Sequence, residues 1–233
     1  MSKKKNLSGK CLALTALWPT QFQYFGKFSF LSKNDFFIFF LLTKIFYKLL
    51  KLHTHYFITK SQYFIFTNQV ILIFSTTFIN IKSLLSFFRF LFLLWNLNIN
   101  SQISLQVYFY LEKSQYFSSD FLKSYILYLM RNKVCSPKKI FNLLILMLKK
   151  NKFQPILTIS KNGFKKNVVT GFKIQLKGRY ESTKNEMASR LFITNGKTNS
   201  TTLNISINYL NHFFYTKLGT SNLKIWVFHS LKL

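Results

Sequence analysis

The chain has 233 residues, 49% of them hydrophobic, which is enough for one large domain or two small ones with separate cores. Lysine and arginine total 33 against 5 aspartates and glutamates, so the formal net charge is +28. This charge excludes a protein that works free of any partner, because its field attracts every polyanion. Either nucleic acid or an anionic membrane surface would satisfy it.

The first 33 residues are predicted to form a basic tail. They begin "MSKKKNLSGKCLALTALW", a basic stretch followed by a short apolar run that ends at Trp18-Pro19. A signal peptide begins in the same way, but no small-residue cleavage site follows. An apolar helix is predicted from the N-cap candidates Asn34 and Asp35 to about Leu50.

The next part of the chain is rich in predicted strands. The runs "HYFIT", "YFIFT" and "VILIF" are short, aromatic and β-branched, and Asn68-Gln69 is a plausible turn between the last two. A helix is predicted over Lys82–Trp95. The segment "QISLQVYFYL" (102–111) alternates, with Ile103, Leu105, Val107, Phe109 and Leu111 on one face, as expected for a half-covered strand.

Two further helices follow. The first is predicted to be capped by Ser118, Ser119 or Asp120 and to end near Asn132. The second begins at Ser136 with Pro137 in its first turn, where a missing N–H costs nothing. Its buried stripe is predicted to be Ile140, Leu144, Met147 and Leu148. The mixed, basic residues 151–170 are predicted to be a loop-rich insert.

The last third of the chain contains "TGFKIQLKGRY" (170–180), an alternating strand between two glycines. Phe172, Ile174 and Leu176 are predicted to face the core and Lys173 and Lys177 the solvent. Gly171 and Gly178 indicate chain reversal or close backbone approach at either end. Further strands are predicted at "TLNISINY", with Leu203, Ile205, Ile207 and Tyr209 inward, and at "LKIWVF". This order of elements predicts a two-domain α+β chain.

These C-terminal motifs carry a resemblance to a known family. "GFKIQLKGR", "EMASR", Gly196, "TTLNISINY" and "LKIWVF" follow one another as in the C-terminal domain of small ribosomal subunit protein three, the universal S-three family. The family's strand ends in Gly-Arg, a Glu-x-Ala-Arg-like segment follows, and a Trp lies in the final strand. Gly178-Arg179, Glu186-Met187-Ala188 and Trp226 take those places here.

The resemblance implies a fold and its domain boundaries. Residues 1–33 would be the tail, 34–150 a degenerate type II KH-like domain, 151–170 the insert, and 171–233 the C-terminal α/β domain with a mixed sheet. A KH domain clamps the nucleotide backbone with a G-x-x-G loop. The chain has no glycine between Gly26 and Gly163, and the expected loop position reads "INIK" (79–82). We therefore expect a KH-like scaffold without this clamp.

The resemblance also implies a function. The chain would be a structural constituent of the head of an organellar small ribosomal subunit, in contact with ribosomal RNA, neighbouring head proteins and mRNA at the channel by which mRNA enters. Lys138 and Lys139 fall where the family carries a basic pair facing that path; a solvated helix start is the alternative. The full set of predicted RNA-binding residues is Lys3, Lys4, Lys5, Lys138, Lys139, Lys173, Lys177, Arg179, Lys184, Arg190 and Lys197.

Catalytic and metal chemistry find no support in the sequence. Cys11 and Cys135 lie far apart, and His53 and His55 have no visible third ligand for a metal. There is no carboxylate pair, nucleophile elbow or P-loop. We therefore predict a protein that is not an enzyme and holds no cofactor and no metal.

Composition and hydropathy bear on the location of the protein. The 29 phenylalanines and the large excess of lysine over arginine are typical of an AT-rich gene, hence of an organelle genome. We predict a mitochondrial ribosome, encoded in the organelle, with a plastid as second choice. The apolar stretches "FFIFFLL" (36–42) and "LLSFFRFLFLLW" (84–95) are shorter than the roughly 20 residues of a spanning helix, so no membrane span is expected. A basic integral membrane protein of an organelle is the alternative.

Overall fold

The computed structural model describes part of the chain, divided between two compact units. The described residues are 40, 58–65, 69–76, 81–98, 104–111, 118–131, 136–150, 155–160, 163–180, 187–202 and 204–232. One unit comprises Trp18–Lys113, and the other comprises Met1–Leu17 with Ser114–Leu233. The predicted tail lies outside the described residues, as does the predicted helix at 34–50 except for the helical residue Phe40.

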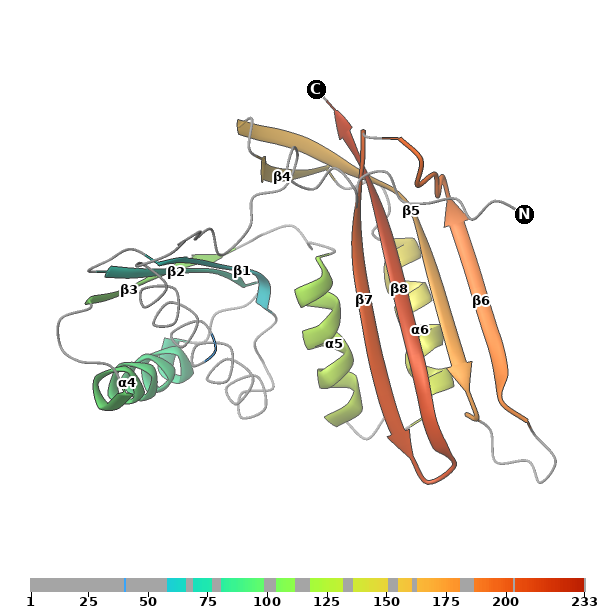
Figure 1. Cartoon of the computed structure of the whole chain (residues 1–233), viewed down its shortest axis with the longest axis horizontal. Coiled ribbons are helices and arrows are strands. Elements are labelled where there is room, and N and C mark those ends of the chain that lie inside the picture. The colour runs from blue at the N-terminus through green and yellow to red at the C-terminus, as the bar shows by residue number, and fades with distance from the viewer. Residues whose placement is uncertain are drawn as a thin grey trace, which may run out of the picture. The chain divides into compact units, whose positions relative to one another are not determined.

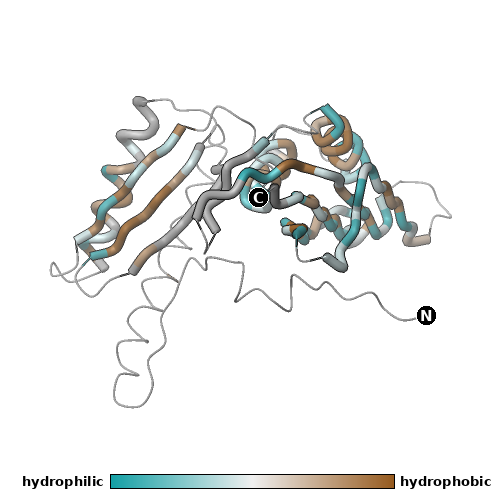
Figure 2. Tube along the Cα trace, turned by 90° about the horizontal axis from the view of Figure 1, so that it is seen from above, coloured by the Kyte–Doolittle hydropathy of each residue, from teal (hydrophilic) through white to brown (hydrophobic). Residues whose placement is uncertain are grey.

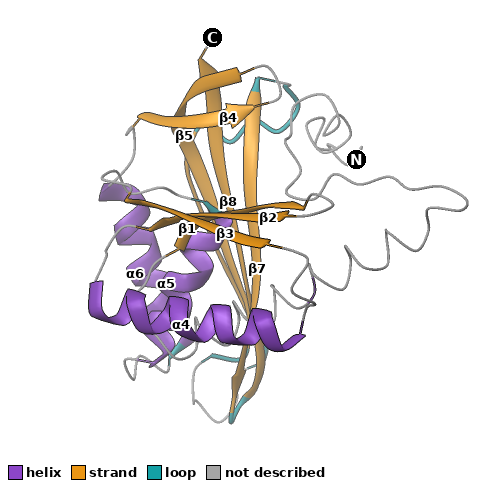
Figure 3. Ribbon diagram, turned by 90° about the vertical axis from the view of Figure 1, so that its left-hand side faces the viewer, coloured by secondary structure: helices purple, strands orange, loops and turns teal. Residues whose placement is uncertain are grey.

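In the unit that ends at Lys113, the described residues include a three-stranded sheet and a long helix (Figures 1 and 3). Strands β1 and β2 are antiparallel, and β3 runs parallel to β2 after α4. The helix confirms the prediction at 82–95 and extends it at both ends. The bounds are β1 Ile58–Ile65, β2 Gln69–Thr76, α4 Ile81–Asn98 and β3 Ser104–Leu111.

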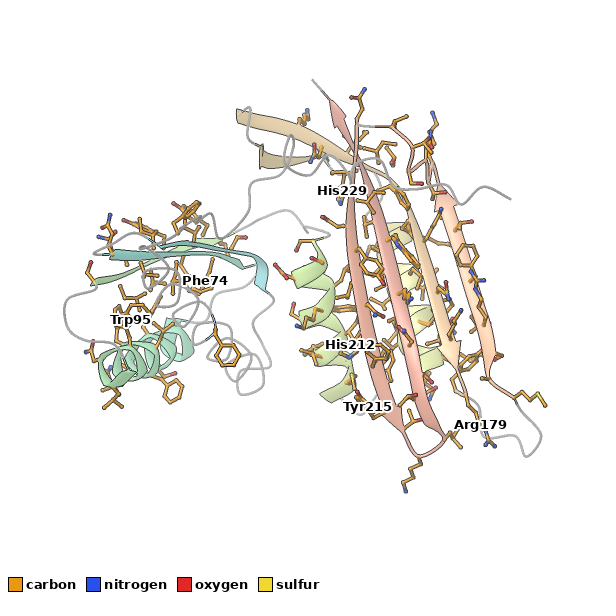
Figure 4. All side chains as sticks on the ribbon, in the orientation of Figure 1. Phe74, Trp95, Arg179, His212, Tyr215 and His229 are labelled. Atoms are coloured by element: carbon orange, nitrogen blue, oxygen red, sulfur yellow. The ribbon has the colours of Figure 1, made fainter. Side chains whose placement is uncertain are left out.

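The core of this unit lies between the sheet and α4. The alternate residues Val70, Leu72 and Phe74 of β2 are fully buried, and Leu91 and Trp95 of α4 are buried as well. Figure 4 shows Phe74 and Trp95 between the sheet and the helix. On β3 the residues at 105, 107 and 109 are half-buried and their neighbours exposed, which confirms the predicted alternation up to residue 109.

The described part of the second unit begins with two helices, α5 (Ser119–Arg131) and α6 (Pro137–Lys150). The predicted N-cap of α5 is confirmed, because the Ser118 hydroxyl accepts a hydrogen bond from the Phe121 N–H at 3.1 Å. Pro137 begins α6 as predicted. The buried stripe of α6 is wider than predicted, and Met147 lies only at its margin. Its members are Pro137, Ile140, Phe141, Leu144, Ile145 and Leu148.

These helices cover one face of a five-stranded sheet (Figure 1). β5 pairs with β8 along most of its length, and β7 pairs with β8 on the far side. On its other edge β5 pairs first with β4 and then with β6. The strands are β4 Pro155–Ser160, β5 Gly163–Gly178, β6 Ser189–Gly196, β7 Ile205–Thr216 and β8 Gly219–Lys232.

The strand directions correct the prediction of a mixed C-terminal sheet. Every pairing described in this sheet is antiparallel, whereas the parallel pair β2–β3 belongs to the three-stranded sheet. A combination of helices and strands is confirmed. The predicted domain boundaries at 33, 150 and 170 follow the family resemblance and stay a prediction; the compact units divide between Lys113 and Ser114, so α5 and α6 share a unit with the C-terminal strands.

The segment 151–170 is not loop-rich in its described part. β4 and the first half of β5 form an antiparallel hairpin there. The lysines of the segment suggested a loop, but cationic side chains are also common on sheet margins, where they face water. Gly171 lies inside β5, where the register with β8 shifts, and does not reverse the chain. A Cβ at this position would lie 2.6 Å from the Lys197 carbonyl oxygen, so close backbone approach explains the glycine.

The face of the sheet against α5 and α6 is apolar; we call it the covered face. Phe172, Ile174 and Leu176 are fully buried there, as predicted. Figure 2 shows hydrophobic and hydrophilic residues alternating along the strands. The other buried members are Leu210 and Phe214 of β7 and Leu223, Ile225 and Val227 of β8.

β7 corrects the prediction that Ile205, Ile207 and Tyr209 face inward. Leu210 and Phe214 are the buried residues, and the side chain of Tyr209 is 45% exposed on the opposite face. The prediction failed because large apolar residues occur on both faces of this strand. Leu203 lies outside the described residues. Of the helices that the described ranges contain, none combines the length and the apolar character that crossing a bilayer requires.

Candidate nucleic-acid interface

The face of the five-stranded sheet opposite the helices has rows of side chains that follow the strand register; we call it the open face. Directly paired residues of antiparallel strands point to the same side of a sheet. Each row therefore crosses β6, β5, β8 and β7 in that order. The rows are Arg190, Lys177, Asn222 and Phe213; then Phe192, Gln175, Lys224 and Asn211; then Thr194, Lys173, Trp226 and Tyr209.

The charges of the open face are all positive. Lys177 and Arg190 lie directly opposite each other on neighbouring strands, and a pair of like charges in this position is destabilising. Within the described ranges the sole acidic residue is Asp120, in the first turn of α5. This part of the protein therefore supplies no carboxylate to the face. An anionic partner would relieve the repulsion.

Contacts with aromatic rings and one amide hold two of these cations at the face. The Lys173 Nζ atom lies 5.3 Å from the centroid of the Phe228 ring, and the Arg190 guanidinium carbon lies 5.0 Å from that of Phe192. The Arg190 Nη2 donates a hydrogen bond to Gln175 Oε1 at 3.3 Å, and this glutamine is buried. These contacts order the cations without neutralising them.

Two further predicted RNA-binding residues, Arg179 and Lys197, lie just after the ends of strands. Arg179 follows Gly178 at the exit of β5 and is half-buried; its carbonyl oxygen accepts a hydrogen bond from the Ser221 hydroxyl at 3.3 Å (Figure 4). Lys197 is exposed just after β6, and its N–H donates to the Thr170 carbonyl at 3.1 Å. The backbone at both positions is therefore fixed by the sheet.

The remaining predicted residues are not part of the open face. Lys138 and Lys139 are exposed in the first turn of α6, a turn without an acidic residue. Lys3, Lys4, Lys5 and Lys184 lie outside the described residues. The structure thus brings Lys173, Lys177 and Arg190 together on one surface.

Lys224 and the aromatic residues of the open face were not predicted from the sequence. Lys224 alternates with the buried residues Leu223 and Ile225. The rule that placed Lys173 outward would have found it. Tyr209 was missed because the alternation of "TLNISINY" placed it inward, and Phe213 was missed because the predicted strand ended at Tyr209.

A histidine on the covered face has a shifted pKa. Burial lowers the pKa of His212 below its usual range, and the charge of Lys123 on α5 lowers it further. The imidazole packs edge-on against Phe214, with ring centroids 5.2 Å apart. The described residues contain no group of three histidine, cysteine or acidic side chains that could hold a metal ion. His53 and His55 lie outside them.

Comparison with known proteins finds similarity to a mitochondrial ribosomal protein. The small ribosomal subunit protein uS3m of Chondrus crispus is 35% identical over 125 residues, which cover 54% of this chain and 51% of the relative. The chain thus matches about half the length of this relative. No family model matches the chain. The similarity confirms the resemblance to the S-three family, and it supports the prediction of a protein that is not an enzyme.

Proposed function

From the resemblance of the chain to the mitochondrial S-three protein, we propose that it is a structural constituent of the mitochondrial small ribosomal subunit. In this proposal it lies in the head of the subunit and contacts ribosomal RNA and neighbouring head proteins. The observation that carries the proposal is this similarity to a ribosomal protein in a chain of net charge +28. A folded surface of cations without acids needs a permanent polyanion, and ribosomal RNA is one.

The open face is the proposed site of contact with ribosomal RNA phosphates. Lys173, Lys177 and Arg190 project from adjacent strands of a sheet whose other face is anchored by α5 and α6. Cations on a rigid surface bind phosphates with little loss of side-chain freedom, particularly where a ring already orders them. The further proposed contacts are Lys3, Lys4, Lys5, Arg179, Lys184 and Lys197.

The first turn of α6 is the proposed contact with mRNA. Lys138 and Lys139 lie beside the N-terminal, partially positive end of the helix, where cations are unfavourable by about 0.3–1 kcal/mol each. Helix stability therefore does not explain this pair. The exposed lysines and the helix end together favour an anion, and the family resemblance makes that anion mRNA at the channel by which it enters the subunit.

The three-stranded unit is proposed to be a KH-like scaffold. Its order of two strands, a helix and a strand parallel to the second supports such a relationship. Of the expected nucleotide-clamping position 79–82, residues 79 and 80 lie outside the described residues, and 81 and 82 begin α4. The absence of glycine from Lys27 to Asn162 argues against a G-x-x-G clamp, so we propose that this unit does not capture single strands in the KH manner.

The gene is proposed to lie in the mitochondrial genome. Lysine greatly outnumbers arginine, although the planar guanidinium is the better phosphate ligand. Selection for phosphate binding therefore does not account for the lysines, whereas an AT-rich genome does.

Co-sedimentation tests the proposal. The endogenous protein, detected by antibody in a mitochondrial lysate, should sediment with small-subunit ribosomal RNA in a gradient that contains magnesium. It should shift towards the top of the gradient when EDTA removes magnesium and dissociates the particle. Alkaline carbonate should release it from membranes. A protein that never sediments with this RNA, or that stays in the membrane after carbonate treatment, would refute the proposed function.

A further inference from the structure

The open face carries large aromatic rings that solvent reaches. The exposed fractions are 45% for Tyr209, 48% for Phe213 and 47% for Phe192, and Trp226 is partly exposed. Several large exposed rings on one face of a sheet are a candidate interaction surface. These rings do not contribute to the core, since α5 and α6 pack against the other face.

Rings and cations occur together in each of the three rows described above. Tyr209 pairs with Trp226, with ring centroids 5.4 Å apart, in the row that also holds Lys173. The next row combines Phe192 with Lys224. The row beyond it combines Phe213 with Lys177 and Arg190. A partner that matches this pattern must present a planar apolar group and a negative charge at each repeat.

Unpaired RNA has this repeat, because each nucleotide carries one base and one phosphate. Successive rows on a strand are about 6.7 Å apart, since every second residue faces the same side. Bases stacked in a helix repeat at about 3.4 Å. Nucleotides that follow the rows must therefore be unstacked from one another, as bases in loops and bulges are when proteins bind them. A duplex would offer its phosphates to the lysines but would leave the rings without partners.

We propose that the open face binds an unpaired RNA strand, with bases stacked on Tyr209, Trp226 and Phe213 and with phosphates at Lys173, Lys177 and Lys224. The inference rests on the proposed function, because it names the form of RNA that the cationic face contacts. It assigns the rings a role that phosphate binding alone does not require. The ordering contacts of Lys173 with Phe228 and of Arg190 with Phe192 prepare the surface before RNA arrives.

The test compares single-stranded and double-stranded RNA. Full-length protein is titrated with a labelled oligouridylate and with a labelled RNA duplex of equal length at the same salt concentration. The variants are Tyr209→Leu and Phe213→Leu, which keep apolar bulk and remove the ring. The matched control is Tyr110→Leu, since Tyr110 is 56% exposed on β3 of the other unit. Thermal unfolding of each variant is measured beside binding.

Loss of a stacked base should weaken binding of the oligouridylate about tenfold in each open-face variant. Duplex affinity and the salt dependence should stay at their wild-type values, and Tyr110→Leu should bind as the wild type does. Two variants on separate rows keep the test decisive if one of them folds poorly.

Unchanged oligouridylate affinity in both variants would overturn the inference, as would an equal loss for the duplex or for Tyr110→Leu. An open face that crosslinks only to protein in the assembled particle would also overturn it, in favour of a protein partner. These failures are distinct from failure of the proposed function, which is judged by co-sedimentation of the wild-type protein with small-subunit RNA.

Discussion

The two faces of the five-stranded sheet come from the same strands but depend on different partners. On β5, Ile174 is fully buried against the helices, while its neighbours Lys173 and Gln175 project to the open face. The covered face is stabilised by contacts with other parts of the same chain, α5 and α6. The open face collects like charges and exposed rings, which in isolation contribute little to stability or oppose it.

This difference teaches that alternation in a strand can encode two separate functions. Substitutions on the covered face should change folding first and binding only as a consequence. Substitutions on the open face should change binding while folding is preserved.

The largest effect is expected from Ile174→Ala. Removal of a fully buried isoleucine side chain typically costs about 2–5 kcal/mol, through lost transfer energy and the cavity left behind. That is a large share of a typical stability of roughly 5–15 kcal/mol. Chemical denaturation of the full chain measures the free energy of unfolding.

Ile207→Ala is the matched control, because Ile207 is half-buried in the row of Phe228 on the open face. It should cost clearly less than Ile174→Ala. Equal costs, or a silent Ile174→Ala, would show that the faces are wrongly assigned.

A smaller effect is expected from Gly178→Ala at the exit of β5. Gly178 has a positive φ of 137°, and a Cβ there would lie 2.7 Å from the Cα atom of Ser221. Backbone strain alone costs roughly 1–3 kcal/mol in such conformations. Gly219 has a similar φ of 121° with nothing within 4 Å of an added Cβ, so Gly219→Ala isolates the strain. Gly178→Ala should lower the midpoint of thermal unfolding more than Gly219→Ala; the reverse order would contradict the close packing of Gly178 against Ser221.

The covered face also predicts a dependence of stability on pH. Burial and the charge of Lys123 lower the pKa of His212 in the folded protein, whereas the unfolded chain has a pKa near 6.5. Between these two values the unfolded state binds the additional proton. The contribution of neutral His212 is therefore complete above about pH 6.5 and is lost as pH falls through the lower, folded value. The free energy of unfolding, measured from pH 7.5 to about 5, should decline less steeply in His212→Gln than in the wild type. Parallel declines would show that His212 is not a source of the pH dependence.

Much of the fold follows from local patterns in the sequence. The Ser118 cap, Pro137 at the start of α6 and the alternation of Phe172, Ile174 and Leu176 each have one physical explanation. The sequence was ambiguous in β7, where Tyr209 and Leu210 are both apolar and only packing against α5 decides which is buried. It was also ambiguous at β4, because charge suggested a loop where an antiparallel partner makes a strand.

The candidate site was predictable in part. Lys173 and Lys177 were identified by strand alternation together with charge, and Arg190 was part of the predicted RNA-binding set. These residues lie on one surface because β5 pairs with β6, which brings together residues that are distant in sequence. β6 itself was not predicted, since "SRLFITNG" is short and begins and ends with residues typical of turns. The rows that contain aromatic residues could not be predicted, because they depend on the register of four strands.

The most direct test of the separation between the faces is the salt dependence of RNA binding by the double variant Lys173→Gln/Lys177→Gln. The free energy of unfolding should change by no more than about 1 kcal/mol, which allows for the contact of Lys173 with Phe228. The slope of log affinity for single-stranded RNA against log salt should become shallower by about 1.4, or roughly 0.7 for each lost phosphate contact. Lys149→Gln/Lys150→Gln removes the same charge from the exposed end of α6 and should leave the slope unchanged. An unfolded Lys173→Gln/Lys177→Gln variant, or a slope equal to that of the wild type, would contradict the account.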